Sequence, residues 1–258
     1  MTNNNPIGLF DSGIGGTSIW KAIHQLLPNE STLYLADSKN APYGQRSKEE
    51  IIALSCKNTE LLLEQNCKLI VVACNTATTN AIKELRAKYD VPFIGIEPAI
   101  KPAALNSKTQ IIGILATKGT LNSALFNQAL LQYQDVKIIE QVGHGLVPLI
   151  ENGAMDSAEM YQLLETYLEP MIAANIDYLV LGCSHFPYLI PLIKKILPPY
   201  IKIIDSGEAV ARQTQFILKS KIGFNVATKP TYIFITNSDS KVLKDVLKDP
   251  YEIFEKDF

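Results

Sequence analysis

The chain has 258 residues, of which 47% are hydrophobic and 19% are charged, and its formal net charge is −2. This composition is typical of a globular protein with a substantial core in one or two domains. A nearly neutral chain predicts no basic face, so we expect no nucleic-acid partner. No apolar run approaches the ~20 residues that cross a bilayer, and the start of the chain does not resemble a secretion signal. We therefore expect a cytoplasmic protein with no membrane partner.

Short apolar runs alternate with longer helical patterns along the chain, which predicts an α/β fold with mostly parallel strands. The expected strands are Ile7–Phe10, Leu33–Ala36, Leu69–Ala73, Phe93–Ile96, Gln110–Ala116, Val136–Val142, Tyr178–Leu181, Lys202–Ile204 and Tyr232–Thr236. The expected helices include Lys48–Glu64, Ala77–Lys88, Ser157–Ala174 and Glu208–Lys219.

The chain repeats itself weakly, which favours two similar halves. The segment IGLFDSGIGG, which begins at Ile7, resembles IGILATKGT, which begins at Ile112, and KLIVVACNT resembles DYLVLGCSH at a nearly equal offset. Ligands of open α/β sheets bind beyond the carboxyl ends of the strands. We therefore expect two similar parallel-sheet α/β domains related by pseudo-twofold symmetry, with the active site in the cleft between them.

The segment around Glu97–Pro98 is the expected boundary between the two domains. Prolines at positions 98 and 102 suit a linker or the start of a helix better than a helix interior. The chain is expected to return to the first domain near Asp205. The prediction is a discontinuous first domain, residues 1–97 plus 206–258, and a second domain, residues 98–205.

The four cysteines are expected to be free thiols, because disulfides are rare in the cytoplasm. No pair of them has the C-x₂-C spacing of a zinc site and the three histidines are scattered, so we expect no metal. Cys74 and Cys183 each follow an apolar strand, and a thiol that precedes a helix lies near the positive end of its dipole. Cys56 and Cys67 have no such position and are interpreted as structural.

Polar residues directly after the two cysteines strengthen the interpretation of a site. Asn75 and Thr76 follow Cys74, and both suit helix capping and hydrogen bonding to a carboxylate. Cys183 is followed by a serine and then by His185, which can act as an acid or a base near neutral pH. The pattern therefore predicts one polar cluster around each thiol.

Three further segments carry weaker signals. Asp11 ends the first strand in DSGIGG, where an acid would repel a phosphate, so we favour a general base or an orienting group beside a thiol over a dinucleotide site. Residues 41–44 are predicted to form a surface turn. Glu151 lies at the end of a helical pattern, where an acid is ordinarily solvated. Alone, the turn and Glu151 indicate structure rather than function.

Four motifs stand out by their order and spacing: FDSGIGG at 10–16, YLADSKNAPYG at 34–44, ACNTAT at 73–78 and GCSHFP at 182–187. Together they resemble the cofactor-independent aspartate/glutamate racemase family, and glutamate racemases in particular. The resemblance spans Ile7 to about Gly207. The family commonly has GCTHYP where this chain has Ser184 and Phe186, and serine keeps the hydroxyl donor. The segment 143–145 also departs from the usual pattern.

The resemblance implies that Cys74 and Cys183 are the catalytic acid/base pair, with Cys183 deprotonating the L-enantiomer and Cys74 the D-enantiomer. It implies that Asp11 assists Cys74, while His185 and Glu151 assist Cys183. The implied substrate-binding residues are Asp11, Ser12, Pro42, Tyr43, Gly44, Cys74, Asn75, Thr76, Cys183, Ser184 and His185. It implies no cofactor and no metal, the small molecule L- or D-glutamate as partner, and it allows a homodimer.

Two thiols suit this reaction because inversion at Cα removes a proton from one face and delivers another to the opposite face. Without a pyridoxal electron sink, the carbanion must be stabilised by preorganised donors and by exclusion of water. The resemblance thus implies interconversion of L- and D-glutamate, and it also implies that the D-glutamate is supplied for peptidoglycan synthesis.

Three other functions stay open at this point. The nearest is an aspartate racemase or another two-cysteine relative, although such relatives often carry His and Glu where this chain has Thr78 and His185. A cysteine hydrolase would use Cys183 as nucleophile and His185 as base, and would leave Cys74 without a role. A non-catalytic amino-acid-binding protein would not need both thiols.

Overall fold

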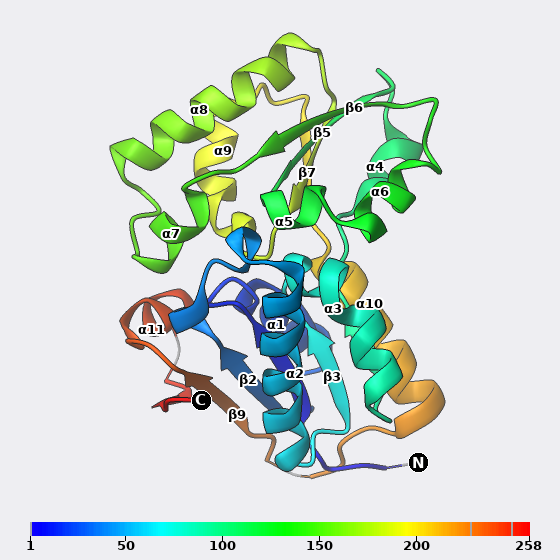
Figure 1. The fold of residues 1–258 in the computed structure, drawn as a ribbon, viewed down its shortest axis with the longest axis vertical. Coiled ribbons are helices and arrows are strands. Elements are labelled where there is room, and N and C mark those ends of the chain that lie inside the picture. The colour runs from blue at the N-terminus through cyan, green and yellow to red at the C-terminus, as the bar shows by residue number, and fades with distance from the viewer. Residues whose placement is uncertain (1, 228, 249) are drawn as a thin grey trace.

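The structure is a computed structural model that describes residues 2–227, 229–248 and 250–258. Its strands form two parallel sheets, one in each half of the molecule in Figure 1. The six-stranded sheet has the order β10-β9-β2-β1-β3-β4, and the four-stranded sheet has the order β6-β5-β7-β8. Their bounds are β1 (Ile7–Asp11), β2 (Thr32–Ala36), β3 (Leu69–Val72), β4 (Phe93–Gly95), β5 (Ile111–Ala116), β6 (Lys137–Val142), β7 (Tyr178–Gly182), β8 (Lys202–Ile204), β9 (Tyr232–Thr236) and β10 (Glu252–Glu255).

The second sheet repeats the strand order of part of the first, since β6-β5-β7-β8 matches β2-β1-β3-β4. In this match β5 is equivalent to β1, and β7 is equivalent to β3. Cys74 follows β3 and Cys183 follows β7, so the two thiols leave equivalent strands. The predicted α/β fold with two similar parallel-sheet halves is confirmed.

Helices connect the strands, as the long crossovers of a parallel sheet require. They are α1 (Thr17–Leu26), α2 (Lys48–Glu64), α3 (Asn75–Lys88), α4 (Ile100–Asn106), α5 (Lys118–Leu121), α6 (Ala124–Leu130), α7 (Leu146–Glu151), α8 (Ala158–Ala173), α9 (Ile190–Ile196), α10 (Gly207–Ile217) and α11 (Lys241–Leu247). Short turns of helix also form at η1 (Ser38–Asn40), η2 (Tyr43–Gln45), η3 (Phe186–Leu189) and η4 (Leu218–Ile222). At the start of α2, the Ser47 hydroxyl accepts from the Glu50 N–H, and the Glu50 carboxylate accepts from the Ser47 N–H.

The central strands are buried along their whole length, because helices cover parallel sheets on both faces. One buried apolar cluster joins the two halves and includes Leu9 and Tyr34 from the first sheet and Leu115 and Leu181 from the second. The halves therefore share a core, and their strand ends meet at a packed boundary.

Each of the two sheets is formed by a separate part of the chain. Strands β5 to β8 lie between residues 98 and 205, and the other strands lie outside that range. The exact domain limits of 1–97 plus 206–258 and 98–205 stay a prediction. Among the described residues, no helix is both long and apolar enough to cross a membrane.

A buried ion pair fixes the amino-terminal edge of the six-stranded sheet. Lys68 Nζ lies 2.7 Å from Glu30 Oε2, and the two side chains are only 1% and 3% exposed. Lys68 Nζ also donates to the Asn3 carbonyl at 2.6 Å, and Glu30 Oε1 accepts from the Asn225 N–H at 2.8 Å. The pair thus joins segments that are far apart in the sequence, and each buried charge has a partner.

Replacing Lys68 with Met is expected to lower the free energy of unfolding by about 3–5 kcal/mol, because Glu30 would keep a buried charge without its partner. Chemical denaturation measures the loss. Lys88→Met is the matched control, since Lys88 pairs with Glu60 at 2.9 Å but both side chains are exposed, so little or no loss is expected. Equal losses in the two variants would contradict the role given to burial.

Candidate active site

Cys74 is the N-cap of α3, which explains why this helix begins two residues before its predicted start. Its sulfur accepts a hydrogen bond from the Ala77 N–H at 3.4 Å and lies 3.7 Å from the Ser12 hydroxyl. The residue is only 4% exposed. Burial raises the pKa of Cys74, the negative charge of Asp11 raises it further, and the Ala77 N–H opposes both. The free protein therefore favours the thiol form at Cys74.

Cys183 follows β7 in the position that Cys74 has after β3, and it is 6% exposed. Its sulfur lies 3.8 Å from Nδ1 of His185. A charge on Cys183 raises the pKa of Cys74, so the two sulfurs interact electrostatically across the boundary between the halves. The structure thus brings together the two thiols that the sequence singles out.

His185 is buried, and its ring nitrogens lie near acidic and sulfur-containing side chains. Its Nε2 donates to Glu151 Oε1 at 2.6 Å, and its Nδ1 lies 4.0 Å from Asp11 Oδ2. Burial alone would lower the pKa of His185, but the hydrogen bonds to Cys183 and Glu151 and the charge of Asp11 raise it well above the usual value. His185 therefore carries a proton at neutral pH and presents a positive charge to Cys183.

Glu151 ends α7 in the second half, and its carboxylate reaches into the first. Oε1 accepts from the Ile14 N–H at 2.7 Å, and Oε2 accepts from the Ser38 hydroxyl at 2.8 Å. Together with His185, these donors place one carboxylate between three loops. Glu151 is thus part of the cluster and not a solvated acid at a helix end.

The glycines of DSGIGG make this close approach feasible. A Cβ atom at Gly13 would lie 2.0 Å from Glu151 Oε1, and one at Gly15 would lie 2.2 Å from His185 Nδ1. Any side chain at either position would displace the acid or the imidazole. The glycine run therefore serves the packing of Glu151 and His185 against the end of β1.

Asp11 links the two halves at the floor of the cluster. Its Oδ1 accepts from the Ser184 hydroxyl at 3.0 Å, and its Oδ2 accepts from the Gly13 N–H at 3.1 Å. Burial raises the pKa of Asp11, while the adjacent His185 opposes this effect. Toward Cys74 it acts through its charge. Whether Asp11 assists Cys74 in a reaction stays a prediction.

The remaining predicted residues differ in which of their atoms are available. The Tyr43 hydroxyl donates to Asp37 at 2.5 Å and accepts from Asn58 at 3.1 Å, so it is occupied within the first half. Asn75 Nδ2 donates to a backbone carbonyl at 3.4 Å, but its buried Oδ1 has no hydrogen-bond partner among the described residues. That oxygen is a group that a bound ligand would satisfy.

Thr117 is a residue of this boundary that the sequence analysis missed. Its hydroxyl lies 2.8 Å from the hydroxyl of Thr76 and 3.1 Å from that of Thr120. The internal repeat contained the signal, because Thr117 follows β5 where Ser12 follows β1. Two further contacts cross the boundary: the Ser18 hydroxyl donates to the Ser184 carbonyl at 2.8 Å, and the hydroxyls of Thr17 and Tyr188 lie 2.5 Å apart.

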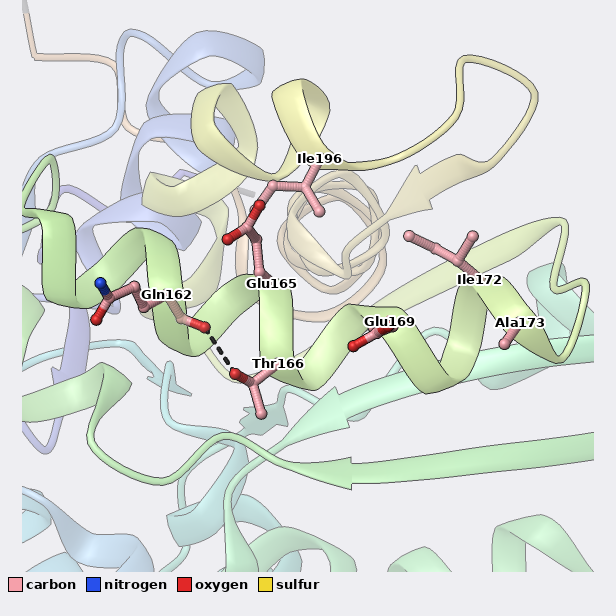
Figure 2. Close-up of a pocket in the computed structure, with 7 residues that line it drawn as sticks. All are labelled: Gln162, Glu165, Thr166, Glu169, Ile172, Ala173 and Ile196. Atoms are coloured by element: carbon pink, nitrogen blue, oxygen red, sulfur yellow. Dashed lines mark hydrogen bonds between the residues drawn. The ribbon is translucent and has the colours of Figure 1, made fainter.

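Surface pockets do not by themselves locate the cluster of polar residues around Cys74 and Cys183. Figure 2 shows a pocket of about 620 Å³ that contains none of the predicted site residues and in which Thr166 donates to the Gln162 carbonyl. Six of its seven labelled residues belong to α8, and Ile196 belongs to α9. Among the described residues, no group of three or more His, Cys, Asp or Glu side chains is arranged to hold a metal ion. The absence of a metal and of a cofactor from the reaction stays a prediction.

Comparison with known proteins gives a consistent result. A family profile described as Asp/Glu/Hydantoin racemase matches residues 7–214. A glutamate racemase of Ralstonia pickettii is 50% identical over 208 residues, which cover 80% of this chain and 74% of that protein.

Two solved structures extend the match to almost the whole chain. A glutamate racemase isoform of Bacillus anthracis superposes with a TM-score of 0.89 at 32% identity, covering 98% of each chain. The glutamate racemase of Escherichia coli, solved with L-glutamate and the activator UDP-MurNAc-ala, gives a TM-score of 0.88 at 32% identity, again covering 98% of each chain. The chain belongs to the Asp/Glu/Hydantoin racemase family.

Proposed function

We propose that this chain is a glutamate racemase that interconverts L- and D-glutamate with Cys74 and Cys183 as its two acid/base groups. One observation carries the proposal: two buried thiols follow equivalent strands of the two halves and interact electrostatically. The residues of the cluster would hold any small acidic amino acid. The preference for glutamate is therefore supported by the glutamate racemases that the chain resembles. The enzyme is an amino-acid racemase.

In the proposed reaction the substrate lies between the two sulfurs. One thiolate removes the Cα proton from one face, and the opposite thiol delivers a proton to the other face. After each turnover the protonation states of the two sulfurs are exchanged. A single base would tend to return the proton to the face from which it came.

The surroundings of the two sulfurs differ. Burial and the charge of Asp11 favour the thiol at Cys74, while Nδ1 of His185 lies 3.8 Å from the sulfur of Cys183. In the proposed L-to-D direction Cys183 would remove the Cα proton and Cys74 would protonate the opposite face. Glu151 holds the imidazole in place through Nε2, and so acts on Cys183 indirectly.

The carbanion requires stabilisation, because an amino-acid Cα proton is only weakly acidic. The N-terminus of α3 at Cys74 provides backbone N–H groups and the positive end of a helix dipole. The hydroxyl of Ser12, which lies 3.7 Å from the sulfur of Cys74, adds a side-chain donor near the same point. Closed packing excludes water, which strengthens each of these interactions.

A cysteine hydrolase is the second candidate that the geometry favours, since Cys183, His185 and Glu151 form a row of nucleophile, base and orienting acid. The row leaves the buried thiol of Cys74 without a role, and the family to which the chain belongs consists of racemases. Racemisation accounts for both thiols.

We also propose that the product D-glutamate is used for peptidoglycan, as the resemblance implies. The enzyme would work in the cytoplasm, where the four free cysteines stay reduced. The homodimer that the resemblance allows stays a prediction.

Wild-type enzyme incubated with L-glutamate in D₂O, without added cofactor, is expected to form D-glutamate that carries deuterium at Cα. Cys74→Ala and Cys183→Ala are each expected to abolish interconversion, because each removes the proton carrier on one face. Chiral chromatography with mass spectrometry measures both product and label. The same assay with aspartate tests the substrate preference.

Cys67→Ala is the matched control, because Cys67 is another buried thiol and burial raises its pKa to about 12. It lies in the core of the first half, and its variant is expected to racemise glutamate like the wild type. Near wild-type racemisation by Cys74→Ala would rule out the two-base mechanism.

Replacing Glu151 with Gln is expected to lower the pKa of His185, because the substitution removes a negative charge whose oxygen lies 2.6 Å from Nε2. NMR titration of the imidazole should show deprotonation about 1–3 pH units lower than in the wild type. Because the imidazolium of His185 then loses its proton at lower pH, the alkaline limb of the pH profile of kcat/KM should also shift to lower pH. Glu208→Gln, at an exposed position on α10, is the control. An unchanged imidazole titration in Glu151→Gln would contradict this electrostatic role.

A further inference from the structure

A pocket of about 410 Å³ lies where the two halves meet and is lined by basic side chains. Arg46 and Lys48 come from the segment that begins α2, Lys118 begins α5, and His144 lies in the loop before α7. None of the residues that line this pocket is acidic. The pocket therefore has the charge that attracts an anion.

This basic pocket adjoins a smaller cavity, with which it shares lining residues. The cavity has a volume of about 30 Å³ and shares Gly44, Lys118 and His144 with the basic pocket. At its inner side it reaches Thr117, whose hydroxyl is 2.8 Å from that of Thr76. Thr76 lies in the first turn of α3, which Cys74 caps. The contact between Thr117 and Thr76 thus lies between this cavity and the helix that Cys74 caps.

A narrow seam, the contact of Gly119 with Thr76 and Gly44, separates the basic pocket from the start of α3. A Cβ atom at Gly119 would lie 2.9 Å from the Thr76 methyl group and 3.1 Å from Gly44 Cα, so the two glycine backbones almost touch. In Figure 1, α5 lies at the boundary between the halves beside α3, and it also packs on η2. Because Cys74 and Cys183 are only 4% and 6% exposed, a substrate has to part such a contact to reach them. The basic pocket lies directly outside this seam.

The three permanent cations of the pocket are not equally available. Arg46 Nη1 lies 3.7 Å from Glu50, and Lys48 Nζ lies 3.6 Å from Glu84. Lys118 is exposed, and no carboxylate among the described residues forms an ion pair with it. Of the three cations in the basic pocket, Lys118 thus has the charge that is least compensated by a nearby carboxylate.

We propose that this basic pocket is a vestibule that captures a carboxylate of the acidic amino-acid substrate before it passes the seam, with Lys118 as the capturing cation. The inference rests on the proposed function for the identity of the substrate, which carries two carboxylates and a net negative charge. Lys118 is a positioning residue: it acts on the approach and retention of the substrate, while proton transfer takes place at the sulfurs.

Lys118→Met is expected to raise KM about two- to fivefold for both enantiomers and to leave kcat unchanged, because an exposed charge pair is weak. Lys118→Glu is expected to raise KM further. Raising the ionic strength from about 0.05 to about 0.5 M should raise KM of the wild type and have a smaller effect on Lys118→Met.

Lys137→Met is the matched control, because Lys137 is an exposed lysine at the amino end of β6, opposite the strand ends that carry the site. It is expected to keep the wild-type KM and salt response. A KM and salt response of Lys118→Met equal to those of the wild type would overturn the vestibule.

Calorimetric titration with glutarate separates this inference from the proposed function, because glutarate carries both carboxylates but has no amino group and no stereocentre to invert. Weaker glutarate binding by Lys118→Met than by the wild type and by Lys137→Met supports the vestibule even if no racemisation is found. Wild-type racemisation with equal glutarate affinity in all three proteins refutes the vestibule and leaves the proposed function intact.

Discussion

The carboxylate of Glu151 holds the site together, because it satisfies donors from separate loops at one point. It accepts from the Ile14 N–H and the Ser38 hydroxyl in the first half and pairs with His185 in its own half. A charge that is withdrawn from water needs such partners, so displacing any one of these loops would leave charge or donors unpaired. The absence of a side chain at Gly13 follows directly from this crowding.

The two halves repeat a topology but not a chemistry. Equivalent strands deliver Cys74 and Cys183, yet one sulfur meets a helix start and a serine while the other meets a buried imidazole. Asp11 connects the two environments, since it hydrogen-bonds Ser184 and raises the pKa of Cys74. The repeat therefore explains why there are two thiols, and the local contacts give each thiol a different set of neighbours.

Much of this arrangement could be predicted from the sequence, because buried parallel strands are continuous apolar runs and the cysteines directly follow two of them. Strand β10 escaped prediction because it is a partly exposed edge strand with a glutamate at each end, so its apolar pattern is weak. The commitment of the Tyr43 hydroxyl to Asp37 and Asn58 also could not be predicted, since it depends on contacts distant in sequence. For the same reason the place of Glu151 could be taken only from a resemblance, while its contacts required the structure.

The unlike surroundings of Cys74 and Cys183 have a thermodynamic consequence for a racemase. Mirror-image substrates have equal free energies in water, so at equilibrium they are present in equal amounts. The ratio of kcat to KM must then be the same in both directions, whatever the residues around each sulfur. The imidazole beside Cys183 can change how tightly each enantiomer is held and how fast it turns over, but only in compensating proportion. The fold is thus free to give its two halves different neighbours, since no asymmetry between them can bias the final mixture.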